Sequence, residues 1–264
     1  DQAGILAQAE KISDGVQRYL DQAQTAGELA SAAPGLAVKR LKQRHDELYG
    51  GFSPAPKFPN EPDYLFLIDY ARREADGEMV QLIRFDLDTM ARGGIYDQVG
   101  GGFHRYSTDQ DWLVPHFEKM LYDNALLLSV HGLALRMGVG EADMHERVID
   151  LTLGWLQREM LDPDGGCWST LDADSEDSSG RKEEGEFYLW TPAEVEAVLG
   201  PELASSACQY WSVTDEGNFE GSGRSVLVLG EVSGEMDEES LRSKLLASRA
   251  ERPRPGTEIG RAHV

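Results

Sequence analysis

A glycine-rich segment followed by ionisable and aromatic side chains is the part of this sequence best suited to chemistry. Gly100–Gly102 are followed closely by His104, Arg105 and Tyr106. Glycine lets the backbone adopt conformations closed to other residues and approach a ligand closely. A histidine side chain can transfer protons near neutral pH, and an arginine can bind a carboxylate or orient hydroxyl groups. We predict a sugar or polyol site here, with His104 as a catalytic residue and Arg105 and Tyr106 as substrate-binding residues.

Further candidates follow a short distance downstream. We expect a helix to begin near Pro115, because proline fits the first turn of a helix. His116 would then lie at the rim of the site as a second catalytic candidate. Lys119 and Asp123 are four residues apart, so they could instead form only an ion pair along the helix. The substrate-binding candidates of this stretch are Trp112, Glu118, Lys119, Tyr122 and Asp123.

An acidic loop offers the other catalytic candidates, Asp172 and Asp174. Two carboxyl groups can act as general acid and general base in glycoside hydrolysis, and their separation sets the stereochemical outcome. Trp168 and Trp190 lie on either side of this loop and could stack on a sugar ring. The loop could equally be a solvated acidic surface. As a calcium loop it would need glycine where Asp177 stands, so we expect no metal site.

The glycine segment does not predict a nucleotide cofactor. A dinucleotide site needs its glycines between a strand and a helix, and Gly100–Gly102 lack that context. The segment could also be a tight loop that binds nothing. We expect no cofactor.

The composition is that of an acidic, soluble, globular protein. The chain has 264 residues, and 47 acidic side chains against 25 Lys and Arg give a net charge of −22. Nucleic-acid binding needs a cationic surface, so this charge argues against a nucleic-acid partner. The most apolar stretch, 124–137, is interrupted by Ser129, His131 and Arg136. It is too short and too polar to cross a membrane, which needs about 20 apolar residues.

Cysteine usage suggests the compartment. Cys167 and Cys208 are the two cysteines of the chain, and they do not form a C-x-x-C motif. A disulfide-stabilised secreted domain would contain more cysteines. We therefore expect free thiols in a reducing compartment and a cytoplasmic location.

Helical periodicity dominates outside the glycine-rich segments. Apolar residues recur at spacings of three and four, which predicts amphipathic helices. The expected helices cover 5–20, 36–48, 64–71, 79–90, 117–135 and 148–160, and short strand-like runs cover 186–190 and 225–229. A weak repeat relates 101–109 to 165–172, each between two helices, as in an array of helical hairpins. The predicted fold is mainly α: an incomplete α/α toroid with short β-hairpins in its long loops.

Long motifs carry a resemblance to a known family. The segments are Gly50–Pro59, Met90–Ser107, Trp112–Asn124, Asp172–Glu176 and Glu184–Trp190. They closely resemble the thioredoxin-domain-containing family of spermatogenesis-associated protein 20 and its bacterial relatives, over about Leu36 to Thr257. The resemblance implies a thioredoxin-like domain followed by an α/α toroid similar to six-hairpin glycosidases and N-acylglucosamine 2-epimerases.

The resemblance also implies a domain organisation. Residues 1–35 are expected to be a helical linker from a thioredoxin-like domain that this chain lacks, and residues 36–257 to be part of the toroid. The last seven residues, 258–264, resemble the translation of a common sequencing adapter. We therefore expect the chain to be a fragment of a longer protein with an artefactual tail.

Two functions of different classes follow. The first is a carbohydrate-active toroid that binds a sugar or polyol and performs epimerisation or hydrolysis. The alternative is a non-catalytic helical platform that supports the thioredoxin-like domain, its intramolecular partner in the parent protein. No redox role can be assigned to a residue of this chain.

Overall fold

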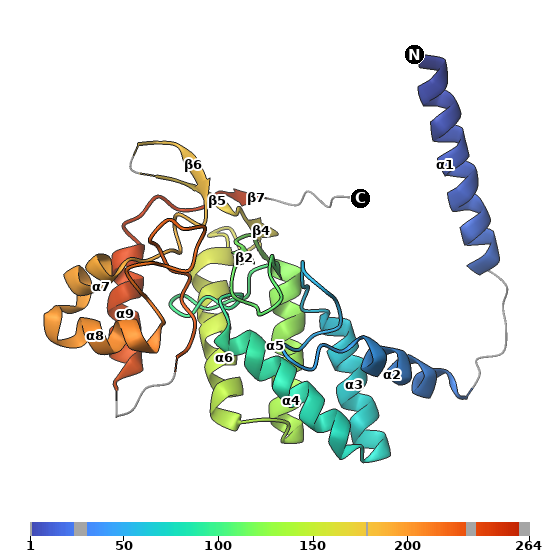
Figure 1. Cartoon of the computed structure of the whole chain (residues 1–264), viewed down its shortest axis with the longest axis horizontal. Coiled ribbons are helices and arrows are strands. Elements are labelled where there is room, and N and C mark those ends of the chain that lie inside the picture. Colours follow the sequence, from blue (N-terminus) through green and yellow to red (C-terminus); the bar gives the residue numbers. More distant parts are fainter. Residues whose placement is uncertain (1, 24–30, 178, 231–235, 259–264) are drawn as a thin grey trace. The chain divides into compact units, whose positions relative to one another are not determined.

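The computed structural model describes residues 2–23, 31–177, 179–230 and 236–258. The chain divides into two compact units, residues 1–40 and 41–264. The first unit contains α1 (Gln2–Ala23) and most of α2 (Ala33–Arg44), as drawn in Figure 1. These helices confirm the expected ones, although α2 ends before Leu48. The tail that resembles a sequencing adapter covers residues 258–264, and residues 259–264 lie outside the described part of the chain.

The second unit is built mainly from helices. They are α3 (Glu61–Glu74), α4 (Gly77–Arg92), α5 (Leu121–Met137), α6 (Ala142–Trp155) with a π-helical turn (Leu156–Met160), α7 (Pro192–Leu199), α8 (Pro201–Tyr210) and α9 (Glu238–Arg249). Helix α3 packs against α4 and α5, and α5 also packs against α6. Figure 1 shows α3 and α5 starting at the same end of the unit, with α4 and α6 running back. The fold is therefore mainly α, with helical hairpins α3–α4 and α5–α6, as predicted.

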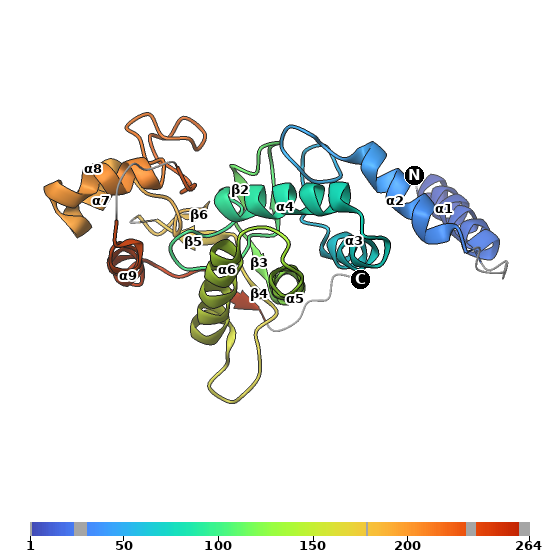
Figure 2. The same cartoon turned by 90° about the horizontal axis from the view of Figure 1, so that it is seen from below.

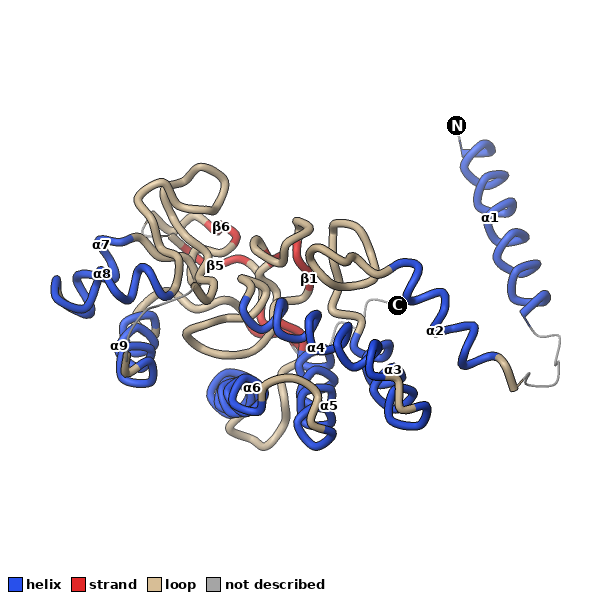
Figure 3. Tube along the Cα trace, turned by 60° about the horizontal axis from the view of Figure 1, so that its bottom comes forward, coloured by secondary structure: helices blue, strands red, loops and turns tan. Residues whose placement is uncertain are grey.

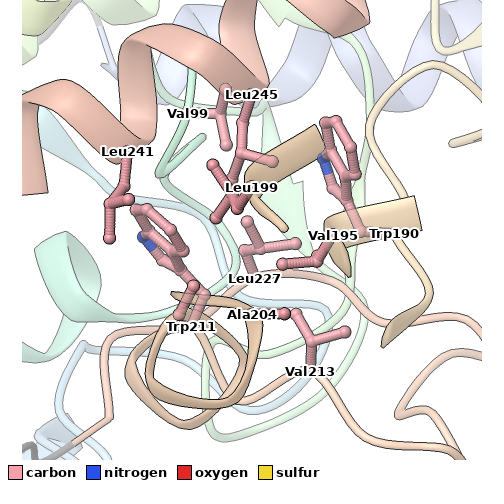
Figure 4. Packing of buried hydrophobic residues seen from close by; sticks show 11 residues of the cluster. Val99, Trp190, Val195, Leu199, Ala204, Trp211, Val213, Leu227, Leu241 and Leu245 are labelled. Atoms are coloured by element: carbon pink, nitrogen blue, oxygen red, sulfur yellow. The ribbon is translucent and has the colours of Figure 1, made fainter. Parts of the chain in front are cut away.

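Helices α7, α8 and α9 form a second group with its own core. Val195 on α7, Trp211 after α8 and Leu245 on α9 are fully buried in one cluster. Figure 4 shows this packing, and Figure 2 shows the three helices grouped beside α6. Burial of such large apolar side chains supplies most of the driving force for packing. Periodicity did not predict these short helices.

Several short strands lie in the long loops between the helices, as expected (Figure 3). All the pairs are antiparallel: β1 (Tyr106–Ser107) with β2 (Pro115–His116), β3 (Lys119–Met120) with β4 (Thr170–Leu171), β4 with β7 (Thr257–Glu258), and β5 (Asp174–Glu176) with β6 (Lys182–Glu184). The strands expected over 186–190 and 225–229 reduce to one bridge between Trp190 and Ser225.

The expected start of a helix near Pro115 is wrong. Pro115 and His116 form β2, and α5 begins only at Leu121. The reason is that β2 and β3 pair with β1 and β4, so backbone groups that a helix would use take part in strand pairing. Side chains alternate between the two faces of a strand. Lys119 is accordingly buried, whereas His116 and Glu118 are partly exposed.

Within the described residues, no helix is both long enough and apolar enough to cross a lipid bilayer. Cys167 and Cys208 are both free thiols.

Candidate functional site

Two buried carboxyl groups lie where α3 and α5 begin. Glu61 is the first residue of α3, and Asp123 lies in the first turn of α5. Their residues are only 6% and 8% exposed. Oε1 of Glu61 is buried with no hydrogen-bond partner, and no described residue donates a hydrogen bond to the Asp123 carboxylate. A buried polar group without a partner costs free energy, so these two carboxyl groups stand out in the molecule.

The electrostatic surroundings of Asp123 favour its protonated form. Burial raises the pKa of Asp123 to about 7, and the negative charges of Glu61 and Glu118 add to the effect, whereas Arg105 opposes it. Burial also raises the pKa of Glu61. A carboxyl group that titrates near pH 7 can act as a general acid or a general base.

An ion pair stands beside these carboxyl groups. Nη1 of Arg105 donates to Oε2 of Glu118 over 2.8 Å, and the backbone N–H of Arg105 donates to the carbonyl oxygen of Glu118 over 2.8 Å. Tyr122 is about half exposed, and the partial burial of its hydroxyl raises the pKa of that group, with the charge of Asp123 adding to the effect. The guanidinium group and the tyrosine can both contact a ligand held at Asp123.

His116 forms the next part of the same surface. Its Nδ1 lies 2.7 Å from Oε1 of Glu184, and since a carboxylate accepts, Nδ1 donates this hydrogen bond. The imidazole stacks on the Tyr106 ring with ring centroids 4.9 Å apart, and the Phe58 ring also packs on Tyr106. Nε2 of His116 is 3.8 Å from Oε2 of Glu118, so this histidine links the two acidic groups. We call Glu61, Arg105, His116, Glu118, Tyr122, Asp123 and Glu184 the carboxylate site.

Lys119 belongs to a different cluster in the interior. Its Nζ donates to Oδ2 of Asp97 and to the carbonyl oxygen of Gly101, each over 2.8 Å. Arg249 donates two more hydrogen bonds to Asp97. Burial lowers the pKa of Lys119 to about 7, although the charge of Asp97 opposes this. Lys119 therefore does not pair with Asp123, which rules out the helical ion pair considered above.

His104 is also in the interior. It is 2% exposed, and its Nδ1 donates to the carbonyl oxygen of Phe117 over 2.9 Å. Burial holds the pKa of His104 well below its usual value, and the charge of Lys119 adds to the effect. The ring packs edge-on against Tyr188. His104 is therefore neutral at pH 7 and shielded from solvent.

The tryptophans predicted to bind substrate are dispersed. Trp112 is fully buried and donates through Nε1 to the carbonyl oxygen of Tyr49. Trp190 belongs to the α7–α9 core, and Trp168 packs against the cluster that contains Leu171. The structure does not bring these indole rings together with Asp123.

The acidic loop approaches the carboxylate site through β5 and β6. Asp174 in β5 is the strand partner of Glu184, which binds His116. Asp172 directly follows β4, and its Oδ1 lies 3.4 Å from the backbone N–H of Asp174. Both aspartates are partly exposed.

The structure thus gathers six of the predicted residues and adds others. Arg105, Tyr106, His116, Glu118, Tyr122 and Asp123 share one surface. We did not predict Glu61, Glu184 and Phe58 as site residues from the sequence. Glu61 could have been noticed because Pro62 follows it, which marks the start of a helix. No described group of three or more His, Cys, Asp or Glu side chains has the geometry to hold a metal ion.

Fold and site together define a mainly α protein with two packed helical hairpins and an acid-rich site where α3 and α5 begin. The chain is homologous to spermatogenesis-associated protein 20. It is 38% identical to the Homo sapiens protein over 208 residues, which are 73% of this chain and 26% of the relative. It is 43% identical to the Rattus norvegicus protein over 176 residues, which are 65% of this chain and 22% of the relative. The chain therefore spans about a quarter of the length of these curated relatives.

The other comparisons add little. No family model matches the chain. A crystal structure of a sugar epimerase from a ruminal bacterium aligns with a TM-score of 0.43 and 13% identity, over 52% of this chain and 37% of that chain.

Proposed function

We propose that the carboxylate site binds a carbohydrate or polyol and transfers a proton to or from it. The observation that carries this proposal is Asp123, a buried carboxyl group without a hydrogen-bond donor whose pKa is raised to about 7. Elsewhere in proteins, buried carboxyl groups are normally paired. Asp123 is therefore the group best prepared to exchange a proton at neutral pH.

The surrounding groups complement a polyhydroxylated ligand. Sugar hydroxyls can donate to Glu61 and Asp123 and accept from Arg105. The exposed rings of Tyr122 and Phe58 offer apolar surface for the C–H face of a sugar ring. Epimerisation and glycoside hydrolysis both need an acid or base that works near neutral pH, so both stay within the proposal.

The proposal places proton transfer on Asp123 and His116 rather than on His104. His116 is partly exposed and is oriented by Glu184, whereas His104 is buried and neutral. Asp174 is the strand partner of Glu184 in the β5–β6 hairpin. The acidic loop would therefore add carboxyl groups at the edge of the site.

Calorimetric titration with neutral monosaccharides and sugar alcohols tests this function. We expect at least one of them to bind, and Asp123→Asn or Arg105→Ala to weaken its binding by about tenfold or more. Glu146→Gln is the matched control, because Glu146 is an exposed carboxylate on α6 outside the carboxylate site. A panel in which no sugar or sugar alcohol binds the wild-type chain contradicts the proposal.

A further inference from the structure

The carboxyl groups of Glu61 and Asp123 indicate which charge the ligand carries as well as a preference for hydroxyl groups. The other acids of the site already have partners: Glu118 pairs with Arg105, and Glu184 pairs with His116. Oε1 of Glu61 has no hydrogen-bond partner among the described residues, and Asp123 has the charge of Arg105 near it but forms no ion pair. Because α3 packs against α5 and both groups lie in first turns, their charges act on the same small region.

A positively charged donor would satisfy this region better than a neutral one. Ionised hydrogen-bond partners form shorter and stronger hydrogen bonds than neutral ones. An ammonium group has three donors and no acceptor, which suits two carboxylates that need only donors. The exposed ring of Tyr122 is adjacent in sequence to Asp123 and could also face the cation. A metal ion fits less well, since the described side chains include no three-ligand cluster.

We propose that Glu61 and Asp123 form a subsite for a primary ammonium group, so that the ligand of the carboxylate site is an amine-bearing polyol such as an amino sugar or amino alditol. This inference rests on the proposed function and narrows its substrate class. Glu61 binds the ammonium through Oε1, and Asp123 binds it from the neighbouring helix. Arg105 and Glu118 remain available for the hydroxyl groups of the same ligand.

Binding is coupled to proton release. At pH 7 the Asp123 carboxyl is partly protonated, and it must ionise to pair with an ammonium group. The groups that face it are Glu61 from α3, Arg105 and Glu118 from the loops, and Tyr122 from its own helix. Among these, Arg105 favours ionisation of Asp123 and the acids oppose it. The charge of the incoming ammonium group shifts Asp123 to its ionised form.

The test compares D-glucamine with D-sorbitol, which share a carbon chain and differ by an amine in place of one hydroxyl. Calorimetry on the full chain should show D-glucamine binding about tenfold more tightly than D-sorbitol. Glu61→Gln should abolish that preference with little change for D-sorbitol. Glu74→Gln should keep it, because Glu74 is an exposed carboxylate at the far end of α3. Titrations in buffers of different ionisation enthalpy should detect proton release for the wild type and not for Asp123→Asn.

The other outcomes separate this inference from the proposed function. Equal affinity for D-glucamine and D-sorbitol overturns the ammonium subsite and leaves polyol binding intact. A preference that survives in Glu61→Gln overturns the assignment to Glu61. Ethanolamine binding as tightly as D-glucamine supports the ammonium subsite and contradicts a carbohydrate ligand. If neutral sugars bind but neither D-glucamine nor ethanolamine does, the ammonium subsite is refuted and the proposed function stands.

Discussion

Replacing Asp97 should be among the most damaging single changes in this protein. The Asp97 carboxylate accepts hydrogen bonds of 2.8–3.1 Å from both Nη atoms of Arg249, from Nζ of Lys119, and from the N–H groups of Val99 and Gly100. The side chains of Asp97, Lys119 and Arg249 are 4%, 0% and 3% exposed. Although burial by itself would raise the pKa of Asp97, the charges of Arg249 and Lys119 hold it well below its usual value.

The magnitude follows from what Asp97→Asn leaves behind. The substitution keeps the size of the side chain but leaves the buried Arg249, and the Lys119 ammonium in its charged form, without a counter-charge. Removing one partner of a buried ion pair costs about 3–5 kcal/mol, a large part of the roughly 5–15 kcal/mol that stabilises a typical domain. Asp88→Asn is the control, because Asp88 forms an exposed ion pair with Arg92, and such pairs contribute about 0.5 kcal/mol.

Urea denaturation followed by circular dichroism measures both changes. The double variant Asp97→Asn/Lys119→Met should lose less stability than the sum of the single variants, because methionine removes one of the stranded cations. A loss of less than about 1 kcal/mol in Asp97→Asn, or strict additivity in the double variant, would refute the view that this cluster holds α9 to the β3 region.

Other predictions test separate features. Burial lowers the pKa of His131 to about 3, and His145 adds to the effect, so only the unfolded chain binds this proton as the pH falls below 6.5. The free energy of unfolding should therefore decrease from pH 6.5 towards pH 3, and His131→Phe should reduce that slope in urea denaturation. Gly102→Ala should cost about 1–3 kcal/mol in the same assay, because φ is +84° and a Cβ would lie 2.8 Å from the Trp155 ring. Asp76→Ala should cost about 1 kcal/mol of thermal stability by removing the N-cap of α4.

The helices were largely predictable from the sequence because their apolar faces repeat locally. Helices α3 to α6 match the expected ranges apart from their ends. Helices α7 and α8 are short, and their core depends on Trp190 and Trp211, which lie just outside them. A periodicity that spans so few turns gives little signal.

The candidate site was only partly predictable for a related reason. The motif residues Arg105, His116 and Asp123 were identified because they follow unusual local sequence. Glu61 was missed because its importance comes from Asp123, on a helix far along the chain. Glu184 was likewise missed, because only the β5–β6 hairpin brings it to His116. Chemistry that depends on such distant pairs has no local signature.

The strand pairing before α5 determines the charge of the carboxylate site. In a helix starting at Pro115, Lys119 and Asp123 would share a face and neutralise each other. In the observed extended segment, burial alternates from 115 to 120, so Lys119 points inward to Asp97 and Glu118 is left partly exposed. The pairing therefore removes a cation from the neighbourhood of Asp123 and commits it to the interior. The nearby positive charge at Asp123 is then that of Arg105, which is paired with Glu118, and an ammonium-bearing ligand would add a second one.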